Sequence, residues 1–480
     1  MTSTTETATA PAGAYKHAYD PGGFHDEAFD ALGRPRPEYE PLLAELAEHD
    51  LAELAARVSG QSADRGVTFR LDGQARRFPI DPVPRLIEAT EWAWLERGLT
   101  QRARALDAFI ADVYGDQRIV RAGVIPARAI DGAEHFEPWM VGVEVAGGHA
   151  PVAGFDVVRG ADGVLRVLED NLRTPSGMAY ATAARRVVDA HLPPAAQQPK
   201  LPLDPCFGLL GDAIRAAAPD GGGDPSAALL SDGPSNGAWY EHQVLARRLG
   251  IPIVNPSQLC NRGGRLKVTL PSGRLRELQV VYRRTDEDRL RDERGRATWL
   301  ADVLLEPVRS GNLAVVNSFG TGVADDKLLH AYVEDMVRFY LGQEPIVESV
   351  RTYDLGQSHY RTRALGRLGA LVVKPRTGHG GHGVVIGPHA SAEERELAAG
   401  QIRSQPDRFV AQETIRLSRH PTVCDGILEP RHVDLRVFAV GCGDRTGLSP
   451  AALTRVALRR GSLLVNSSQG AGGKDTWVLA

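Results

Sequence analysis

Residues 154–171 (GFDVVRGADGVLRVLEDN) restrict the fold more than any other stretch of the sequence. A β-branched run, a glycine turn at 160–163 and a second run of alternating side chains together predict a β-hairpin. Asp156 lies on its first strand, and Glu169 and Asn171 close its second strand. Side chains two positions apart leave the same face of a strand, so the hairpin can bring Asp156 beside Glu169 and Asn171.

The side chains of Asp156, Glu169 and Asn171 form a set of hard oxygen ligands. Mg²⁺ prefers such ligands, takes one or two carboxylates and completes its coordination with water and substrate phosphates. We therefore predict that these three residues bind Mg²⁺. An exposed hairpin with ordinary surface acids is the alternative, and the TPSG loop at 174–177 favours the binding site.

This hairpin resembles the metal-binding hairpin of the ATP-grasp ligases, which include D-alanine–D-alanine ligase and the glutathione-synthesising enzymes. There an Asp and a Glu-x-Asn pair hold Mg²⁺ against the phosphates of ATP, and a loop of small residues follows. In most of those enzymes the hairpin comes last. Here it stands in the first half of the chain, so the resemblance predicts phosphate-binding Lys and glycine motifs downstream.

Composition and charge indicate a globular protein of several domains. With 480 residues, two to four domains are expected. A net charge of −4 gives no reason to expect nucleic acid as a partner, and no apolar run approaches the ~20 residues of a membrane span. The four cysteines are far apart without a C-x-x-C pair, which argues against zinc and disulfides and favours a reducing, cytoplasmic location.

The order of predicted elements indicates an α/β (α+β) fold in five parts. Together with the ATP-grasp resemblance, this order implies a disordered tail (1–14), a mostly helical N-terminal lobe (15–125), the metal-binding hairpin segment (126–195), a Rossmann-like pre-ATP-grasp domain (200–345) and an ATP-binding part (346–480). The elements expected before residue 195 are helices at 38–58, 84–97, 100–114 and 179–191, a hairpin at 67–80 and a strand at 138–145. Thr100 is the expected N-cap of the third helix.

A βαβ rhythm at 227–254 predicts a parallel sheet, with strands at 227–230 and 251–254 around a helix. Between the first strand and the helix, GPSNG (233–237) matches the G-x-S-x-G pattern of a hydrolase nucleophile elbow. A serine hydrolase that uses Ser235 is therefore a minor alternative. A ligand-binding loop at the carboxyl end of a parallel strand is the favoured interpretation.

Three residues in predicted loops are candidate substrate contacts: Ser176, Ser235 and Arg283. Arg283 belongs to an arginine pair after a strand, and such a pair can clamp a carboxylate or phosphate, although a solvated edge explains it equally well. Further on, a long helix is expected at 325–341, and it begins with two acids and Lys327.

The motifs expected downstream are present. The strand GALVVK (369–374) ends at Lys374, and a glycine-rich loop and a second strand follow. Glycine N–H groups in such a loop can face phosphate oxygens, and Lys374 would place a positive charge on a phosphate. An ordinary glycine-rich hairpin is the alternative. The loop glycines assigned to ATP are Gly378, Gly380, Gly381 and Gly383.

The remaining ATP-grasp parts are assigned by resemblance. FVAQE (409–413) resembles the hinge strand that holds adenine, with Gln412 and Glu413 as candidates, and Lys327 matches an earlier phosphate-binding Lys. HVDLRVFAV (432–440) resembles the Asp-x-Arg strand of the ribosomal-protein glutamate ligases and bacterial glutathione synthetases. The resemblance implies catalytic roles for Arg436, Arg455 and Asn466.

The whole arrangement is similar to the circularly permuted ATP-grasp family, which resembles glutathionylspermidine synthetase and peptide ligases. Shared stretches such as VLEDNLRTPSGM, VVKPRTGHGGHGVVIGP and LVNSSQGAGGKDTWV extend over roughly residues 15–480. The resemblance implies an ADP-forming ligase that uses ATP and Mg²⁺ and joins a small-molecule or peptide carboxylate to an amine through an acylphosphate. It also implies a possible α-helical partner protein of the alpha-E type.

One departure bears on activity. Several relatives have an Arg two residues before the first metal-binding Asp, where this chain has Gly154. Either Arg173 or Arg186 supplies that charge, or turnover is weak. A catalytically weak ATP-binding scaffold that recruits partners is therefore the main alternative function.

Overall fold

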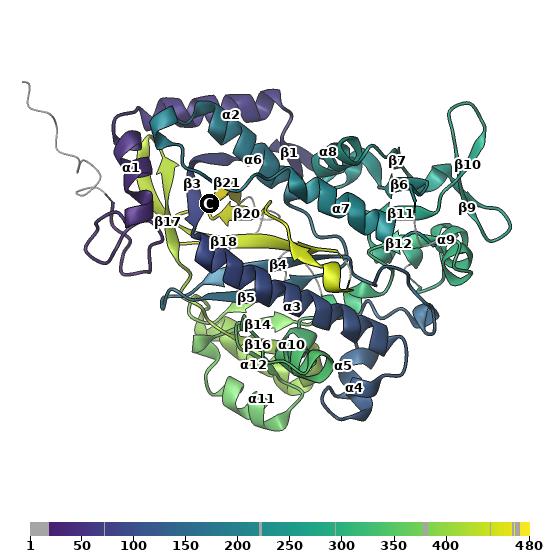
Figure 1. Ribbon diagram of the computed structural model, residues 1–480. Helices are drawn as coiled ribbons and strands as arrows, with labels where there is room; N and C mark the ends of the chain where they lie inside the picture. The colour runs from purple at the N-terminus through teal and green to yellow at the C-terminus, as the bar shows by residue number, and fades with distance from the viewer. Residues whose placement is uncertain are drawn as a thin grey trace, which may run out of the picture.

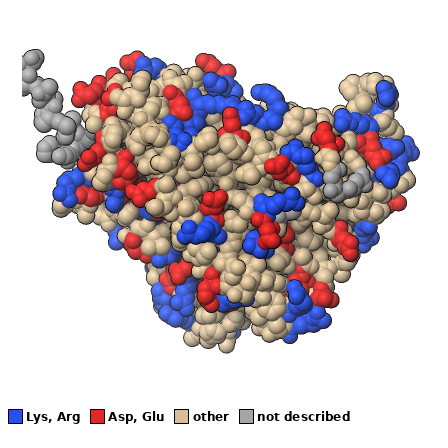
Figure 2. Space-filling model, in the orientation of Figure 1, with Lys and Arg blue, Asp and Glu red and all other residues tan. Residues whose placement is uncertain are grey.

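The computed structural model describes residues 19–71, 73–219, 223–292, 294–377, 383–441, 443–462, 465 and 471–480. Its strands and helices alternate in the manner of a mixed α/β protein, as predicted from the sequence (Figure 1). No helix within these ranges combines the length and the apolar composition that a membrane crossing needs. On the face seen in Figure 2, positive and negative side chains are interspersed.

The central sheet of the described chain joins strands that are far apart in sequence. The hairpin β4–β5 pairs through β4 with β18, a strand that begins more than 250 residues later. The order of its main path is β3-β21-β20-β18-β4-β5, and β17 and β19 also pair with β18. Its strands are β3 (Ile80–Ile87), β4 (Val152–Arg159), β5 (Leu165–Asn171), β17 (Arg419–Cys424), β18 (Ile427–Val440), β19 (Gly447–Leu448), β20 (Leu453–Val456) and β21 (Gly472–Val478).

Helices cover both faces of this sheet. Because side chains alternate along a strand, Val437 of β18 packs in one core and Phe438 in the other. The first core contains the apolar side of α3 (Ala89–Val113), and the second contains α2 (Leu51–Asp64) and α6 (Met178–His191). Figure 1 shows α3 running across one face and α2 and α6 over the other.

The predicted parallel sheet is confirmed. The strands β12 (Ala314–Val316), β11 (Val280–Arg283), β6 (Ala227–Leu230) and β7 (Ile253–Val254) pair in this order, and every pair is parallel. Beside them lie α7 (Pro205–Ala216), α8 (Trp239–Leu249) and α9 (Trp299–Arg309), together with a small sheet of β8 (Leu259–Asn261), β9 (Leu266–Thr269) and β10 (Leu275–Glu277) (Figure 1).

A third sheet carries the predicted ATP-binding strands. It is antiparallel, in the order β13 (Thr352–Asp354), β16 (Phe409–Glu413), β14 (Leu371–Pro375) and β15 (Val385–Ile386). It packs with α11 (Ser358–Leu365) and α12 (Ala392–Ser404), at the bottom of Figure 1. The other elements are α1 (Glu40–Ala47), α4 (Arg118–Arg121), α5 (Ala127–Asp131), α10 (Val333–Met336) and the hairpin β1 (Thr68–Leu71)–β2 (Gln74–Arg77).

Several local predictions were wrong. The helix expected at 38–58 is two helices, because Asp50 caps α2 by accepting hydrogen bonds from two backbone N–H groups. The helix expected at 84–97 begins later, and 80–87 is the edge strand β3, where prolines without an N–H are tolerated. Thr100 is inside α3 rather than at its start.

Two further segments differ from expectation. Residues 138–145 form a 3-10 turn (Pro138–Met140) and loops instead of a strand. The helix expected at 325–341 is divided into a 3-10 segment at Leu329–Tyr332, the short α10 and a π-turn at Val337–Leu341. The domain boundaries stay a prediction, although β3 of the N-terminal lobe shares a sheet with β21.

Candidate active site

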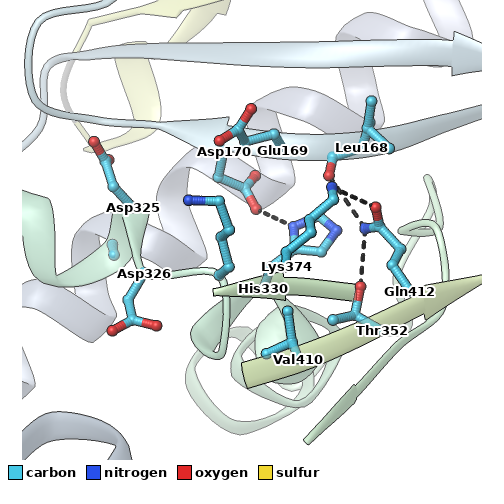
Figure 3. Close-up of a pocket in the computed structure, with 12 residues that line it drawn as sticks. Leu168, Glu169, Asp170, Asp325, Asp326, His330, Thr352, Lys374, Val410 and Gln412 are labelled. Atoms are coloured by element: carbon cyan, nitrogen blue, oxygen red, sulfur yellow. Dashed lines mark hydrogen bonds and ion pairs between the residues drawn. The ribbon is translucent and has the colours of Figure 1, made fainter. Parts of the chain in front are cut away.

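A small cavity between β5 and the antiparallel sheet is lined by both predicted phosphate-binding lysines. Lys327 and Lys374 line it with Glu169, Thr352 and Gln412. Figure 3 shows Lys374 and Gln412 reaching from the antiparallel sheet toward the strand that carries Glu169. The cavity measures only about 10 Å³, which is room for about one water molecule. In this conformation the cavity has no room for a whole nucleotide.

The side chain of Lys374 is positioned by its neighbour across the strands. Lys374 Nζ donates to Gln412 Oε1 at 2.6 Å, and Gln412 Nε2 donates to Thr352 Oγ1 at 2.9 Å. Burial lowers the pKa of Lys374, Glu169 counteracts this shift, and the charge of Lys327 lowers the pKa further. Two ammonium groups held near each other against this cost fit the phosphates of a nucleotide.

The structure separates Glu413 from this cavity. Neighbouring residues of a strand face opposite sides, so Gln412 faces the cavity and Glu413 faces away from it. Tyr353 donates its hydroxyl to Glu413 Oε1 at 2.6 Å, and Arg367 donates to both carboxylate oxygens at 3.2 Å. Gly383 adopts a φ of +71°, which suits glycine. The predicted residues Gly378, Gly380, Gly381 and Asn466 lie outside the described residues.

Asp156, Glu169 and Arg436 are neighbours on three adjacent strands. Asp156 stands opposite Glu169 on β5 and opposite Arg436 on β18, so the hairpin brings Asp156 beside Glu169 as expected. Arg436 donates to both carboxylate oxygens of Asp156, at 2.7 and 2.8 Å, and Arg455 Nη2 lies 2.8 Å from Asp156 Oδ2. Burial opposes ionisation of Asp156, but the two arginines outweigh it and hold its pKa well below the usual range.

Arg455 also belongs to a second ion pair. Its Nε donates to Asp434 Oδ1 at 2.8 Å, and its Nη2 donates to Asp434 Oδ2. Asp434 stands opposite Arg455 on the paired strands β18 and β20. Asp156, Asp434, Arg436 and Arg455 thus form a charge-balanced group in which only Arg436 is partly exposed and each arginine has a fixed orientation.

The described residues fit Mg²⁺ only in part. Among them, no three His, Cys, Asp or Glu side chains are grouped to hold a metal ion. Glu169 and Asn171 offer one carboxylate and one amide oxygen on the same strand. This pair fits an ion that takes its other ligands from water and phosphate. Because arginines engage both oxygens of Asp156, its role as a metal ligand stays a prediction.

A second cavity, of about 190 Å³, lies on the other side of Arg436. Ser176, Arg436 and Arg455 line it, together with residues of the hairpin β1–β2 and of α6. Arg436 therefore contacts Asp156, next to Glu169 of the lysine cavity, and also lines the second cavity. This places one guanidinium group between the two spaces.

The loop that carries Ser176 is held by residues that the sequence analysis did not select. Buried Glu241 accepts hydrogen bonds from the N–H groups of Gly177 at 2.8 Å and Ala179 at 3.0 Å. Arg284 donates to Ser176 Oγ and contacts Glu241 at 3.3 Å. Burial raises the pKa of Glu241, and Arg284 opposes the shift. The acid at the third position of α8 was a weak signal for this role.

Arg283 and Ser235 take positions that differ from their predicted use. Arg283 is 1% exposed, and its guanidinium donates to the carbonyls of Asn317 at 3.1 Å and Ser318 at 3.2 Å. Arg284, the other member of the arginine pair, contacts the loop that carries Ser176. Ser235 is exposed and donates to the carbonyl of Asp232 at 3.2 Å. In the described part of the chain no histidine bonds Ser235, so the hydrolase alternative has no base there.

Gly154 is required by close packing. A Cβ at this position would lie 2.6 Å from Pro175 Cβ, so an arginine would displace the TPSG loop. Neither predicted substitute supplies the missing charge freely, since Arg173 pairs with Asp325 at 2.9 Å and Arg186 is exposed. The arginines that contact Asp156 are instead Arg436 of β18 and Arg455 of β20.

Comparisons with known proteins identify the family of this chain. The sequence profile of the circularly permuted ATP-grasp type 2 family matches residues 84–457. An uncharacterised protein of Mycobacterium tuberculosis is 42% identical over 95% of this chain and 84% of its own length. An uncharacterised Synechocystis protein is 40% identical over 96% of this chain and 98% of its own.

Two further proteins extend the comparison. A Frankia alni protein, named as a candidate glutamate–cysteine ligase, is 44% identical over 96% of this chain, but the match covers 54% of that protein. The apo structure of a glutathione synthetase-like effector from Globodera pallida superimposes with a TM-score of 0.57 and 13% identity, over 89% of this chain and 97% of the effector. This likeness concerns the fold. The chain belongs to the circularly permuted ATP-grasp type 2 family.

Proposed function

We propose that this protein is an ATP-dependent ligase that joins a carboxylate to an amine and forms ADP and phosphate. The observation that carries the proposal is the row Glu169–Asp156–Arg436, which connects the lysine cavity to the second cavity. A phosphoryl donor in the first space and an acid in the second would meet at Arg436. In-line transfer needs such an arrangement.

The proposed chemistry proceeds in two steps. A carboxylate oxygen of the substrate attacks the γ-phosphorus of ATP, the bond to the bridging oxygen breaks, and ADP leaves. The amine nitrogen then attacks the acyl carbon of the acylphosphate, the carbon–oxygen bond to phosphate breaks, and the nitrogen loses a proton. No side-chain nucleophile is required. This agrees with Ser235, which is exposed and has no hydrogen bond to a histidine that could act as its base.

The residues of this chain would divide the work of charge stabilisation. Lys327 and Lys374 would neutralise phosphate oxygens, and Glu169 with Asn171 would hold Mg²⁺, which adds further positive charge at the phosphates. Arg436, fixed by its two bonds to Asp156, would face the transferring group without reorganising.

The names of relatives support the reaction class but not the substrates. The Frankia alni protein is named for a carboxylate–amine ligation, yet this chain matches only 54% of it. Glutamate and cysteine are therefore not carried over. A scaffold that binds ATP without turnover is the second candidate, and the observation that favours it is the engagement of both Asp156 oxygens by Arg436. Cytoplasmic location and an alpha-E-type helical partner remain parts of the proposal.

The test is release of ADP and phosphate from Mg²⁺-ATP in the presence of amino acids, glutathione-like peptides and polyamines. Wild type is compared with Glu169→Ala and with Glu396→Ala, an exposed glutamate on α12. Release that depends on both an acid and an amine, lost in Glu169→Ala and kept in Glu396→Ala, supports the ligase. ATP binding with no stimulated release by any pool, including cell extract, would support the scaffold instead.

A further inference from the structure

The second cavity has an aromatic wall that does not come from the sheet carrying Arg436. Phe69 of β1, Phe78 after β2 and Tyr180 of α6 line it. The ring centroids of Phe69 and Phe78 are 6.1 Å apart, and those of Phe78 and Tyr180 are 4.8 Å apart. Tyr180 already donates its hydroxyl to the carbonyl of Thr68 at 2.9 Å. A ligand therefore meets the apolar ring of Tyr180 rather than a free hydroxyl group.

The cavity is closed by contact between two segments that are far apart in the chain. The N–H of Arg70 donates to the carbonyl of Gly237 at 3.1 Å, which fastens the hairpin β1–β2 to the loop before α8. Gly237 and Ala238 line the cavity on that side. The GPSNG loop, which the sequence predicted to bind a ligand, thus forms part of the wall without using Ser235.

The charge of the lining favours an anion. Arg436 and Arg455 are balanced by Asp156 and Asp434, which lie behind them. Arg70 adds a positive charge, and its Nε is buried without a hydrogen-bond partner. None of the described residues that line the cavity is acidic. A carboxylate is therefore stabilised here, whereas an ammonium group would meet like charge without a counter-ion.

The volume restricts the size of the ligand. At about 190 Å³ the cavity is smaller than the roughly 300–1,000 Å³ of pockets that bind drug-sized molecules. It suits a molecule of the size of a single amino acid. Flat rings that line a small space select a flat or branched apolar body, because polar groups there would lose water without finding partners.

From these observations we propose that the second cavity is the acyl-substrate chamber and that it takes a small carboxylic acid with an aromatic or branched apolar body. The carboxylate lies against Ser176 and Arg436, and the apolar body lies against Phe69, Phe78 and Tyr180. This assignment rests on the proposed ligase function, because it makes the acid the acyl donor. The hairpin β1–β2, which supplies Phe69 and Arg70, is thereby a specificity element.

Equilibrium binding of 3-phenylpropionate to the full chain tests the chamber, with and without Mg²⁺ and a non-hydrolysable ATP analogue. The comparison ligands are 3-phenylpropanamide, which lacks the charge, 3-phenylpropylamine, which reverses it, and glutarate, which lacks the ring. We expect 3-phenylpropionate to bind at least tenfold more tightly than each of the three. Tighter binding of glutarate or of the amine, or no binding of 3-phenylpropionate in either condition, would overturn the proposal.

Two variants and a matched control locate the binding. Gly237→Leu places a larger side chain in the lining of the chamber and should narrow it. The backbone tolerates this change, because a Cβ there meets nothing closer than 3.7 Å and the φ of Gly237 is not positive. Arg70→Gln removes the uncompensated charge. Gly208→Leu makes the same substitution at an exposed position of α7, where a Cβ would have no other atom within 4 Å. We expect a loss of at least tenfold in affinity in the first two and none in the third. Equal affinity in all four proteins would place the ligand elsewhere and refute the assignment.

The failure of this inference is distinguishable from failure of the ligase proposal. Binding of 3-phenylpropionate that follows the expected order, without ADP formation in the presence of any amine, would keep the chamber and refute the ligase. ADP formation that is stimulated by polar dicarboxylates alone and is unchanged in Gly237→Leu would keep the ligase and refute the chamber.

Discussion

Replacing Lys374 with methionine is expected to weaken nucleotide binding without unfolding the protein. The ammonium group of Lys374 lies in a cavity whose burial lowers its pKa, and Lys327 adds like charge. Methionine keeps most of the length and apolar contact of the side chain. It removes a positive charge that is costly in the absence of an anion, and it leaves Gln412 Oε1 without the donor now at 2.6 Å. These two effects oppose each other.

The size of the effect follows from the bonds involved. A hydrogen bond to a charged group contributes about 1.5–3 kcal/mol, so the dissociation constant of Mg²⁺-ATP should rise about 10- to 150-fold. An unsatisfied Gln412 costs about 1–3 kcal/mol and is offset by removal of the desolvated charge, so the melting temperature should move by no more than about 4 °C. Titration calorimetry and thermal unfolding measure the two quantities.

The control for this variant is Lys267→Met on β9, which makes the same charge change far from the cavity. It should leave the nucleotide dissociation constant unchanged. Because phosphate binds the protonated amine, the affinity of wild type should also fall as pH rises through the lowered pKa of Lys374. A Lys374→Met protein that binds Mg²⁺-ATP within twofold of wild type would refute the assignment of the phosphate site.

Three further predictions concern stability. Gly154→Ala puts a Cβ 2.6 Å from Pro175 Cβ and should cost about 1–3 kcal/mol in urea unfolding, so an unchanged midpoint would contradict the packing argument. Burial raises the pKa of Asp26 from 3.8 to about 7, so the stability it contributes is present below about pH 4 and is lost as pH rises toward 7. The difference in unfolding free energy between wild type and Asp26→Asn should therefore change by about 1.4 kcal/mol per pH unit in that window, and equal slopes would refute the shift. Arg283→Met removes donors to backbone carbonyls such as that of Ser318 and should cost about 3 kcal/mol with nucleotide affinity unchanged; weaker nucleotide binding in a stably folded variant would restore its predicted role in the site.

Local periodicity was enough to predict the elements nearest the proposed chemistry. The hairpin at 154–171, the helix that became α6 and the parallel strands at 227–254 all follow from alternation, turn glycines and helical spacing. The prediction of a strand at 138–145 was wrong because turns, with Gly142 at a φ of +75°, position its apolar residues instead of strand pairing. The edge strand β3 was missed because its prolines were interpreted as the start of a helix, whereas a strand at the edge of a sheet tolerates proline.

Local pattern predicted the candidate site only where one element sets the geometry, and Lys327, Lys374 and Gln412, which lie on separate elements, came from the family resemblance. Asp156 and Glu169 face each other because they share a hairpin. By contrast, the bond of Arg436 to Asp156 joins residues 280 positions apart, and no local pattern indicates it. The choice between the two adjacent arginines at the end of β11 depends on which way each one faces, and Arg284 rather than the buried Arg283 contacts the loop that carries Ser176.

The aromatic chamber was outside the reach of sequence reasoning for a similar reason. Its walls come from the hairpin β1–β2, from α6 and from the loop before α8, which approach one another only through the packing of the central sheet. Phe69 and Phe78 belong to the hairpin expected at 67–80, and nothing in that pattern separates a cavity wall from a core residue. Only the cavity between them gives them a second role.

Transfer of oxygen from the acid to phosphate tests the central claim most directly. The carboxylic acid that best stimulates ADP formation is labelled with ¹⁸O in its carboxyl group and incubated with Mg²⁺-ATP, an amine and the wild-type protein. Activation through an acylphosphate predicts one ¹⁸O atom in each phosphate released, in equal amount to ADP and amide. Phosphate that contains no ¹⁸O, because its fourth oxygen comes from solvent, or phosphate release that no acid stimulates, would contradict the ligase.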